Sequence, residues 1–478
     1  MSVGVVVTNQ PLCVDLDGTL VRTDTLYESL IAAAQKWPGF LRALAALPAG
    51  KARFKAVVAE LGPLDASLLP YNDALLAYLA KEKQEGTRLV LATAANRRIA
   101  EAVNGHLNLF DDVIASDEIQ NLRGETKARV LTERFGKRGF RYAGNDRADL
   151  PVWREASSAV LVNTSSNVSK AAAGVAPIEA VFQDKRSLLR ALFRALRPYQ
   201  WSKNFLVFVP ILTAHAERDL HSWFFALLTF LAFCSVASAN YLVNDLLDLP
   251  ADRNHLRKRN RPLASGALPI AIGFPLIILL YGVGAVFAQL STVSYLIALY
   301  VAVTTIYSWK LKKLPLIDFF TLSGLYTLRL FAGGRASGHP VSLWLLAFSS
   351  FLFLSLALVK RVAELKTTEV GGTLRQRAYA FEDTQSLEVM GIASSFASTL
   401  VLTLYIQTDA SVQQLHYERP ELLWMIVPLM LFWQCRLWLS TARKYMQDDP
   451  IVYAARDWVS WIVGICILAS MALARLPR

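Results

Sequence analysis

Residues 240–266 read Asn-Tyr-Leu-Val-Asn-Asp-Leu-Leu-Asp-Leu-Pro-Ala-Asp-Arg-Asn-His-Leu-Arg-Lys-Arg-Asn-Arg-Pro-Leu-Ala-Ser-Gly, and they follow a long apolar run from residue 223. If the helix of that run continues, Asp245, Asp248 and Asp252 occupy positions i, i+3 and i+7 and share one face. Asn244 lies four residues before Asp248 and joins them. Carboxylates at the end of a membrane helix are costly unless they face a cavity and bind something.

The acidic face and the basic loop behind it predict a site for a diphosphate. Clustered oxygen ligands suit Mg²⁺, which usually binds through carboxylates together with substrate phosphates. We therefore expect Mg²⁺ as a cofactor, with the three aspartates as catalytic residues and metal ligands and the loop arginine Arg261 on the phosphate. A solvated helix end beside a loop that is basic for topology is the alternative, but three aligned acids and an asparagine exceed what topology requires.

This stretch resembles the first acidic motif of the UbiA superfamily of intramembrane prenyltransferases. The match is Asn244-Asp-x-x-Asp-x-x-x-Asp252, followed by Arg261-Pro-Leu-Ala-Ser-Gly266, and the resemblance covers residues 195–478. It implies an all-α membrane bundle with an apolar groove for a lipid chain.

Composition divides the 478 residues into parts, since the chain is too long for one ordinary domain. Residues 1–163 are typical of a soluble α/β domain, and from Asn204 onward apolar runs of about bilayer thickness alternate with short charged loops. We predict a linker with an amphipathic helix at 164–196 and a membrane domain at 197–478. About nine spans are expected, near residues 204–217, 222–246, 268–289, 292–309, 316–333, 342–360, 389–407, 421–439 and 457–475.

The formal net charge of +12 is distributed as in a membrane protein, so we expect no nucleic-acid partner. Loops at 249–267, 309–315, 360–388 and 435–456 carry five, three, five and four Lys and Arg residues, and the intervening loops carry three in total. Positive loops lie in the cytoplasm. We therefore predict a protein of the bacterial plasma membrane with its acidic motif and N-terminal domain cytoplasmic and its C-terminus outside; a homo-oligomer is compatible with this.

The N-terminal domain begins with an expected strand, residues 5–14, that leads directly into Asp15-Leu-Asp17-Gly-Thr-Leu. This resembles the first motif of the haloacid dehalogenase (HAD) superfamily of phosphatases, which implies a Rossmann-like α/β fold. By that resemblance Asp15 is the nucleophile and Asp17 the general acid and then base, both beside Mg²⁺. A helical cap is expected at residues 22–80.

The remaining motifs of that family follow in order along the chain. The resemblance implies that Thr93, at a strand end, holds a phosphate oxygen and that Lys127 stabilises nucleophile and phosphate. The metal-ligand position reads Gly-Asn145-Asp146-Arg-Ala-Asp149, where the family usually has Gly-Asp-x-x-x-Asp. Asn145 replaces the usual carboxylate and Asp146 is its nearest substitute, so both an active phosphatase and a weakened or regulatory domain stay open.

The helix expected near residues 188–196 has leucines and a phenylalanine on one face and arginines on the other. A basic amphipathic helix before a membrane domain is typical of an anionic interface. A packing helix between domains is the equal alternative.

The membrane domain opens with Arg197-Pro-Tyr-Gln-Trp-Ser-Lys-Asn204, which resembles the decaprenyl-phosphate phosphoribosyltransferase branch of the superfamily. In the second motif only Asp318 stands where two acids are frequent, and lysines surround it. Fewer acids and more lysines suit phosphoribosyl diphosphate (PRPP), which has an additional 5-phosphate. Asp318 is the expected metal ligand there, and the expected substrate-binding residues of the domain are Gln200, Lys203, Asn204, Asn244, Arg261, Tyr307, Lys310, Lys312, Arg329, Lys360 and Arg361.

These resemblances imply a transferase that joins polyprenyl phosphate to PRPP, with the HAD domain removing the 5-phosphate of the product for a cell-wall arabinan precursor. The alternative is an aromatic polyprenyltransferase acting on a ring such as 4-hydroxybenzoate, which predicts a second full acidic pair. A third hypothesis makes the N-terminal domain a non-catalytic anchor or regulator.

Overall fold

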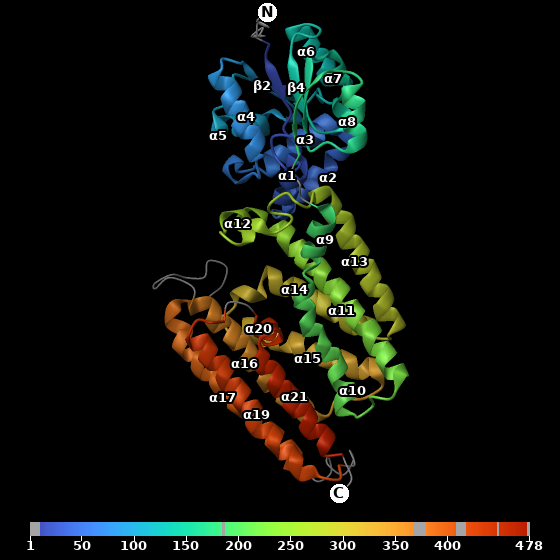
Figure 1. Ribbon diagram of the computed structural model, residues 1–478, viewed down its shortest axis with the longest axis vertical. Helices are drawn as coiled ribbons and strands as arrows, with labels where there is room; N and C mark the ends of the chain where they lie inside the picture. Colours follow the sequence, from blue (N-terminus) through green and yellow to red (C-terminus); the bar gives the residue numbers. More distant parts are fainter. Residues whose placement is uncertain (1–9, 184–186, 367–378, 408–416, 447–448, 476–478) are drawn as a thin grey trace, which may run out of the picture. The chain divides into compact units, whose positions relative to one another are not determined.

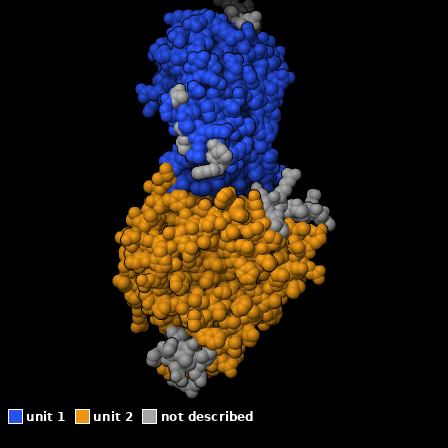
Figure 2. Space-filling view, turned by 180° about the vertical axis from the view of Figure 1, so that it is seen from behind, with its two compact units in different colours: residues 1–196, 242–277 blue, residues 197–241, 278–478 orange. Residues whose placement is uncertain are grey.

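The computed structural model describes residues 10–183, 187–366, 379–407, 417–446 and 449–475. The chain forms two compact units, one of residues 1–196 and 242–277 and the other of residues 197–241 and 278–478 (Figure 2). Most of the acidic stretch therefore belongs to the same unit as the N-terminal domain. The sequence placed it instead in an uninterrupted domain from residue 197.

A six-stranded parallel sheet organises the N-terminal domain, with strand order β3-β2-β1-β4-β5-β6. Figure 1 shows two of its strands, β2 and β4, among the helices of this domain. The parallel sheet confirms the predicted α/β fold. In such a sheet the carboxyl ends of the strands on either side of the change in strand order form a binding crevice, and β1 and β4 meet there. The strands are β1 (Leu12–Val14), β2 (Leu89–Asn96), β3 (Asp112–Ser116), β4 (Arg141–Gly144), β5 (Ser158–Val162) and β6 (Ile178–Phe182).

Both faces of the central strands are buried, so β1, β2, β4 and β5 are almost continuously apolar, whereas β6 is partly exposed. Leu12 and Val14 point to one core, and Cys13 points to the other, as the two-residue period of a strand requires. Helices α4 (Asp73–Gln84) and α5 (Arg97–Leu107) pack on the first face. Helices α6 (Glu125–Phe135), α7 (Leu150–Glu155) and α8 (Ser166–Ala173) pack on the second.

Helices also fill the interval between β1 and β2, where the sequence predicts a cap. They are α1 (Thr25–Ala34), α2 (Trp37–Ala45), α3 (Lys51–Leu61) and then α4, with short 3₁₀ turns at Leu47–Ala49 and Ala66–Leu68. Asp24 starts α1 by accepting the N–H groups of Leu26 (2.9 Å) and Tyr27 (3.4 Å). This is ordinary N-capping.

Two expected boundaries of this domain differ from the structure. The first strand starts at Leu12, and residues 5–9 of the expected strand lie outside the described residues. At the other end, α8 and β6 continue the fold to Phe182, so the predicted boundary at residue 163 is too early. The small polar residues after 163 suggested a linker because a short helix capped by Ser165 and an edge strand have little apolar periodicity.

The acidic stretch contains a break in its helix. Helix α11 (Leu220–Leu247) ends before Asp248, and α12 (Leu249–Asn254) begins with Pro250 in its first turn. Proline is favoured there because its missing N–H is not needed in a first turn. A 3₁₀ turn at Lys258–Asn260 leads to α13 (Ile270–Leu290).

The second unit is helical, and the helix α9 (Leu188–Leu196) precedes it in the chain. Its remaining main helices are η4 (Pro198–Phe208), α10 (Val209–Thr213), α14 (Ser294–Trp309), α15 (Ile317–Ser337), α16 (Leu343–Lys366), α17 (Thr384–Gln407), α19 (Ile426–Ala442), α20 (Pro450–Arg456) and α21 (Trp458–Leu473). One core lies around Phe233 and Tyr300, and a second lies around Phe353 and Trp438.

Within the described residues, five helical segments are long and apolar enough to span a membrane: Leu220–Leu247, Ile270–Leu290, Leu343–Lys366, Phe381–Gln407 and Pro420–Ala442. A sixth results if α20 and α21, bent by 84°, count as one span. The structure does not confirm nine spans. The run at 204–217 is a 3₁₀ segment and a five-residue helix, and α15 carries charged side chains that lower its hydropathy.

Candidate active sites

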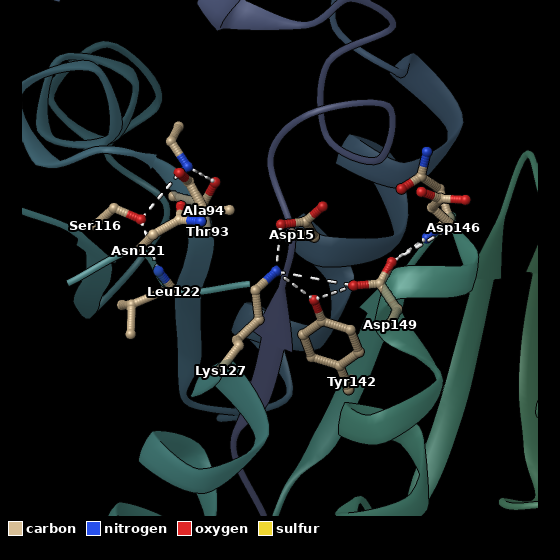
Figure 3. A network of polar contacts seen from close by, with 12 residues as sticks. Asp15, Thr93, Ala94, Ser116, Asn121, Leu122, Lys127, Tyr142, Asp146 and Asp149 are labelled. Carbon is tan, nitrogen blue, oxygen red and sulfur yellow. Dashed lines mark hydrogen bonds and ion pairs between the residues drawn. The ribbon is translucent and has the colours of Figure 1, made fainter. Parts of the chain in front are cut away.

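The carboxyl end of β1 places Asp15 in a buried network of polar side chains (Figure 3). Lys127 of α6 donates to Asp15 Oδ1 at 2.7 Å and to the Tyr142 hydroxyl at 2.8 Å. Tyr142, on β4, in turn donates to Asp149 Oδ1 at 2.8 Å. Lys127 Nζ also lies 3.8 Å from Asp149 Oδ1. One buried ammonium group therefore holds two carboxylates that are 134 positions apart in sequence.

The turn after β4 is built around Asp149. Its Oδ2 accepts the backbone N–H groups of Asn145 (3.0 Å) and Asp146 (3.1 Å). The side chain of Asn145 lies against the turn after β1: a Cβ added at Gly18, whose φ is +74°, would be 2.2 Å from Asn145 Nδ2. Gly18 is thus required both for its left-handed conformation and for the close approach of Asn145.

Asp17, two residues after Asp15, accepts the backbone N–H of Thr25 at 2.8 Å. Burial, together with the nearby charge of Asp24, raises the pKa of Asp17 to about 7. Burial also raises the pKa of Asp15 to about 6, against the opposing charge of Lys127. A carboxyl group with a pKa near neutrality is able both to give and to accept a proton at physiological pH.

A cavity of about 460 Å³ opens in front of these carboxylates. Lys55 of the cap helix α3 reaches into it and donates to the carbonyl oxygen of Ala94 (2.7 Å) and to Asn121 Oδ1 (3.0 Å). Residues 269–271, at the start of α13, form part of its wall. Thr93, expected to hold phosphate, is buried outside the cavity lining, and its Oγ1 accepts the N–H of Ala95 at 2.9 Å.

The donor set of this site fits Mg²⁺, although no group of three His, Cys, Asp or Glu side chains with metal-site geometry occurs in the described part of the chain. Mg²⁺ commonly needs only one or two protein carboxylates, since water and substrate phosphate complete its six positions. Asp15 and Asp149, brought together by Lys127, supply two such carboxylates. Asn145 and Asp146 contact this pair through their backbone N–H groups, which donate to Asp149 Oδ2.

The acidic motif of the membrane domain has a similar arrangement. Arg261 Nη1 lies 3.1 Å from Asp245 Oδ1 and 2.6 Å from Asp252 Oδ2, and both carboxylates are buried. The structure therefore brings the first and third aspartates together, with oxygen donors that also suit Mg²⁺. Asp248 instead lies at the helix break as the N-cap residue of α12, and its N–H bonds to the carbonyl oxygen of Asn244. The single helix that the sequence suggests is therefore divided at Asp248, between the end of α11 at Leu247 and the start of α12 at Leu249.

In the second unit, two predicted substrate-binding residues, Lys203 and Lys360, meet at the buried carboxylate of Asp449. Lys203 Nζ lies 2.7 Å and Lys360 Nζ 3.3 Å from Asp449 Oδ2, and the Tyr326 hydroxyl donates to the same carboxylate at 3.3 Å. Asn204 directly follows Lys203 in the chain, and its Oδ1 accepts a hydrogen bond from Arg329 Nε at 2.8 Å.

A second ion pair of this unit uses Asp318. Arg361 Nη2 lies 2.7 Å from Asp318 Oδ2 with both side chains fully buried, and the Tyr307 hydroxyl donates to Asp318 Oδ1 at 2.8 Å. Arg361 also pairs with Glu364. Asp318 and Arg361 are therefore partners of each other, where the sequence suggested separate roles in metal and phosphate binding.

The remaining predicted substrate-binding residues, Lys310, Lys312 and Gln200, lie outside these two clusters of ion pairs. Lys310 is exposed at the end of α14, and Lys312 lies in the 3₁₀ turn Leu311–Lys313. Gln200 Oε1 accepts a 3.5 Å hydrogen bond from the Tyr241 hydroxyl.

Sequence reasoning missed Tyr142, Lys55 and Asp449 as members of these sites. A tyrosine in a buried strand resembles any core residue, and no motif marks Lys55. Asp449 next to Pro450 suggested only a structural role, and it does cap α20 by accepting the N–H of Ile451 at 3.2 Å. One of its two lysine partners, Lys203, is 246 residues away in sequence.

Comparison with protein families identifies both parts of the chain. Residues 205–449, just over half of the chain, match the model of the UbiA prenyltransferase family. The chain belongs to this family. Residues 49–154 match the haloacid dehalogenase-like hydrolases, so a HAD-like domain precedes the UbiA domain.

Curated relatives cover either the whole chain or the UbiA domain. The chain is 34% identical to an uncharacterised protein, y4nM, of Sinorhizobium fredii, over 97% of this chain and 91% of that protein. It is 34% identical to the nodulation protein NoeC of Azorhizobium caulinodans over 57% of this chain and 89% of NoeC. A decaprenyl-phosphate phosphoribosyltransferase of Corynebacterium glutamicum is also 34% identical, over 42% of this chain and 63% of that enzyme.

Proposed function

We propose that this UbiA-family protein transfers a 5-phosphoribosyl group from PRPP to a polyprenyl phosphate. The similarity to a protein named decaprenyl-phosphate phosphoribosyltransferase supports the choice of substrates. The observation that carries the proposal is the cluster of Lys203, Lys360 and Asp449 within a membrane-type helical unit. Ionisable groups inside such a unit are costly and mark functional sites. Ammonium donors suit the phosphates of both substrates.

The reaction needs no general base, because the lipid phosphate is already an anion. One of its oxygens attacks C1 of PRPP, the bond from C1 to the diphosphate oxygen breaks, and diphosphate leaves with the bonding electrons. The products are polyprenyl-phosphoryl-5-phosphoribose and diphosphate. Asp245 and Asp252 are the residues that would hold Mg²⁺, which when bound neutralises diphosphate charge. Arg261, between the two aspartates, provides a further cation for the leaving group.

We further propose that the HAD-like domain removes the 5-phosphate of this product. A carboxylate oxygen of Asp15 attacks phosphorus while Asp17 gives its proton to the departing ribose oxygen. Water then attacks the aspartyl-phosphate, Asp17 takes the water's proton, and inorganic phosphate leaves. Lys127 holds Asp15 in position and offsets phosphate charge. Mg²⁺ at Asp15 and Asp149 would neutralise further charge.

The wall of the phosphatase cavity supports a membrane-bound substrate. Residues 269–271 line the cavity, and the membrane-span candidate α13 starts at Ile270. Near the start of α13, the ring of Phe274 lies 6.2 Å from that of Tyr27 in the cap helix α1. A phosphate in this cavity would therefore be close to the end of a lipid-facing helix. Cytoplasmic sites and an external C-terminus, as the loop charges predict, belong to this proposal.

The test supplies purified protein with labelled PRPP, Mg²⁺ and decaprenyl phosphate, and separates lipid products by charge. We expect label in a ribosyl lipid, lost in Asp252→Ala, which removes one of the two carboxylates that pair with Arg261. Asp15→Asn should still transfer label but retain the 5-phosphate. Absence of label in the lipid would contradict the phosphoribosyl reaction, and unchanged phosphate release by Asp15→Asn would contradict the HAD step. A product formed from polyprenyl diphosphate and 4-hydroxybenzoate would favour the aromatic alternative.

A further inference from the structure

Arg253 joins three segments of the first unit, one of which, at Glu28, is 225 residues away in sequence. Its Nη1 and Nη2 donate to Glu28 Oε2 (2.8 Å) and Oε1 (2.6 Å), and its Nε donates to the carbonyl oxygen of Ala264 (2.9 Å). Only 7% of the Arg253 side chain and 5% of the Glu28 side chain are exposed. The guanidinium group therefore connects α12, the loop after Arg261 and the cap helix α1 of the HAD-like domain.

These contacts fix the two sides of the acidic motif relative to each other. Asp252 immediately precedes Arg253 in α12, and Ala264 follows Arg261 by three residues. The hydrogen bond from Arg253 to Ala264 thus ties the segment that carries Asp252 to the segment that carries Arg261. A bidentate Arg–carboxylate pair has a defined geometry, so Glu28 determines where the Arg253 fork lies.

Other contacts of the HAD-like domain extend this attachment. Gln35, at the end of α1, donates to the carbonyl oxygen of Leu247 at 2.7 Å, next to the helix break. Gly266 lies against Arg22: a Cβ added at Gly266 would be 2.6 Å from Arg22 Cβ. At its other end α1 begins beside Asp17, which accepts the Thr25 N–H. The helix therefore connects the phosphatase carboxylates to the acidic motif.

We propose that Glu28 of the HAD-like domain is a positioning residue for the acidic motif of the transferase. It acts through Arg253, which sets the separation of Asp252 and Arg261 and so the site for Mg²⁺ and diphosphate. The inference rests on the proposed function for the identity of that ligand. It also gives the fusion of the two domains a reason beyond sequential catalysis, because a residue of one domain completes the structure of the other's site.

The experiment compares Glu28→Gln with Glu60→Gln in the full chain, both in an Asp15→Asn background that disables the phosphatase. Glu60 is a matched control on the neighbouring helix α3, because its pair with Arg98 is exposed and 3.7 Å long. The first readout is the rise in thermal midpoint with increasing Mg²⁺ at fixed diphosphate. The second is the Mg²⁺ dependence of transfer from labelled PRPP.

We expect Glu28→Gln to raise the Mg²⁺ concentration for half-maximal stabilisation by about 10- to 100-fold, the usual effect of removing an outer-shell partner. Glu60→Gln should leave it unchanged. Arg253→Lys, which keeps the charge but loses the bidentate fork, should give an intermediate shift and serves if Glu28→Gln fails to fold. A Mg²⁺ response equal to that of the control in the folded variant would overturn the proposal. Stabilisation by Mg²⁺ and diphosphate without any transfer from PRPP would contradict the proposed function and leave the positioning role intact.

Discussion

Two pairs of buried carboxylates in this protein each form ion pairs with one cationic side chain. The two cations differ in their exposure to solvent and in the element that carries them. Lys127 lies between Asp15 and Asp149, is 4% exposed and belongs to a helix on the sheet. Arg261 lies between Asp245 and Asp252, is 27% exposed and belongs to a loop. The lysine is also held by Tyr142.

The difference indicates separate duties for the two cations. A buried lysine held by three partners on a rigid sheet keeps its place through a catalytic cycle. An arginine on a partly exposed loop is able to shift from the carboxylates to an arriving diphosphate, which its planar fork binds well. The comparison predicts that changes at Lys127 affect both folding and catalysis, whereas changes at Arg261 mainly affect catalysis.

Lys127→Met should have the largest effect. Removing one partner of a buried ion pair costs about 3–5 kcal/mol of stability, and here two carboxylates lose their cation. We expect a markedly lower thermal midpoint of the N-terminal domain and loss of phosphate release from the lipid product. Arg129→Met, on the same helix but exposed, is the control. A variant with the original midpoint would show that Lys127 is not fixed as the contacts suggest.

Arg261→Gln should separate catalysis from stability. Loss of a donor to developing negative charge costs roughly 10²–10³ in rate, so transfer from labelled PRPP should fall by about that factor. The thermal midpoint should fall less than in Lys127→Met, because Arg261 is 27% exposed, so that water reaches its side of the two buried carboxylates. Arg259→Gln in the same loop controls for general loss of positive charge. Equal losses in both variants would assign the effect to the field of the loop.

The same comparison shows what the sequence could predict. Asp15, Lys127 and Asp149 follow strands or begin helices of a parallel sheet, so their motifs and order predicted their meeting. The acidic motif was predicted from helix periodicity, which fails at Asp248 because Pro250 starts a new helix. Contacts such as Lys203 with Asp449 depend on packing of distant helices and have no local signal. The nine predicted spans are not confirmed, because α15 contains buried charged side chains and fails a test of length and hydropathy within the described residues.

Lys55→Gln tests the cap side of the phosphatase cavity and should have a smaller effect. Lys55 donates hydrogen bonds to Ala94 and Asn121 and not to Asp15 or Asp149. Burial lowers the pKa of Lys55, and the nearby charges of Asp17 and Asp24 oppose that shift. Loss of one charge-assisted hydrogen bond costs about 1.5–3 kcal/mol. We expect a KM for the phosphorylated lipid that is higher by roughly tenfold or more, with kcat less affected. A decrease in kcat alone would instead place Lys55 in the chemical step.

Asn145→Asp should give the smallest effect and bears directly on whether the HAD-like site is weakened. The change replaces an amide by a carboxylate next to Gly18, within a turn already fixed by the bonds from the backbone of Asn145 and Asp146 to Asp149. Added negative charge near Asp15 and Asp149 should tighten Mg²⁺, because carboxylate oxygens are its preferred protein ligands. The Mg²⁺ concentration for half-maximal phosphate release should therefore fall by a few-fold, an estimate in line with the effect of one ligand-shell change. Asp146→Asn is the opposite test. If Asp146 takes the place of the carboxylate that the family has at position 145, its loss should raise the Mg²⁺ concentration for half-maximal phosphate release. Adding Asn145→Asp to that variant should then lower the concentration again. If neither variant alters the Mg²⁺ dependence, the pair Asp15 and Asp149 suffices, and the asparagine is a neutral departure from the family pattern.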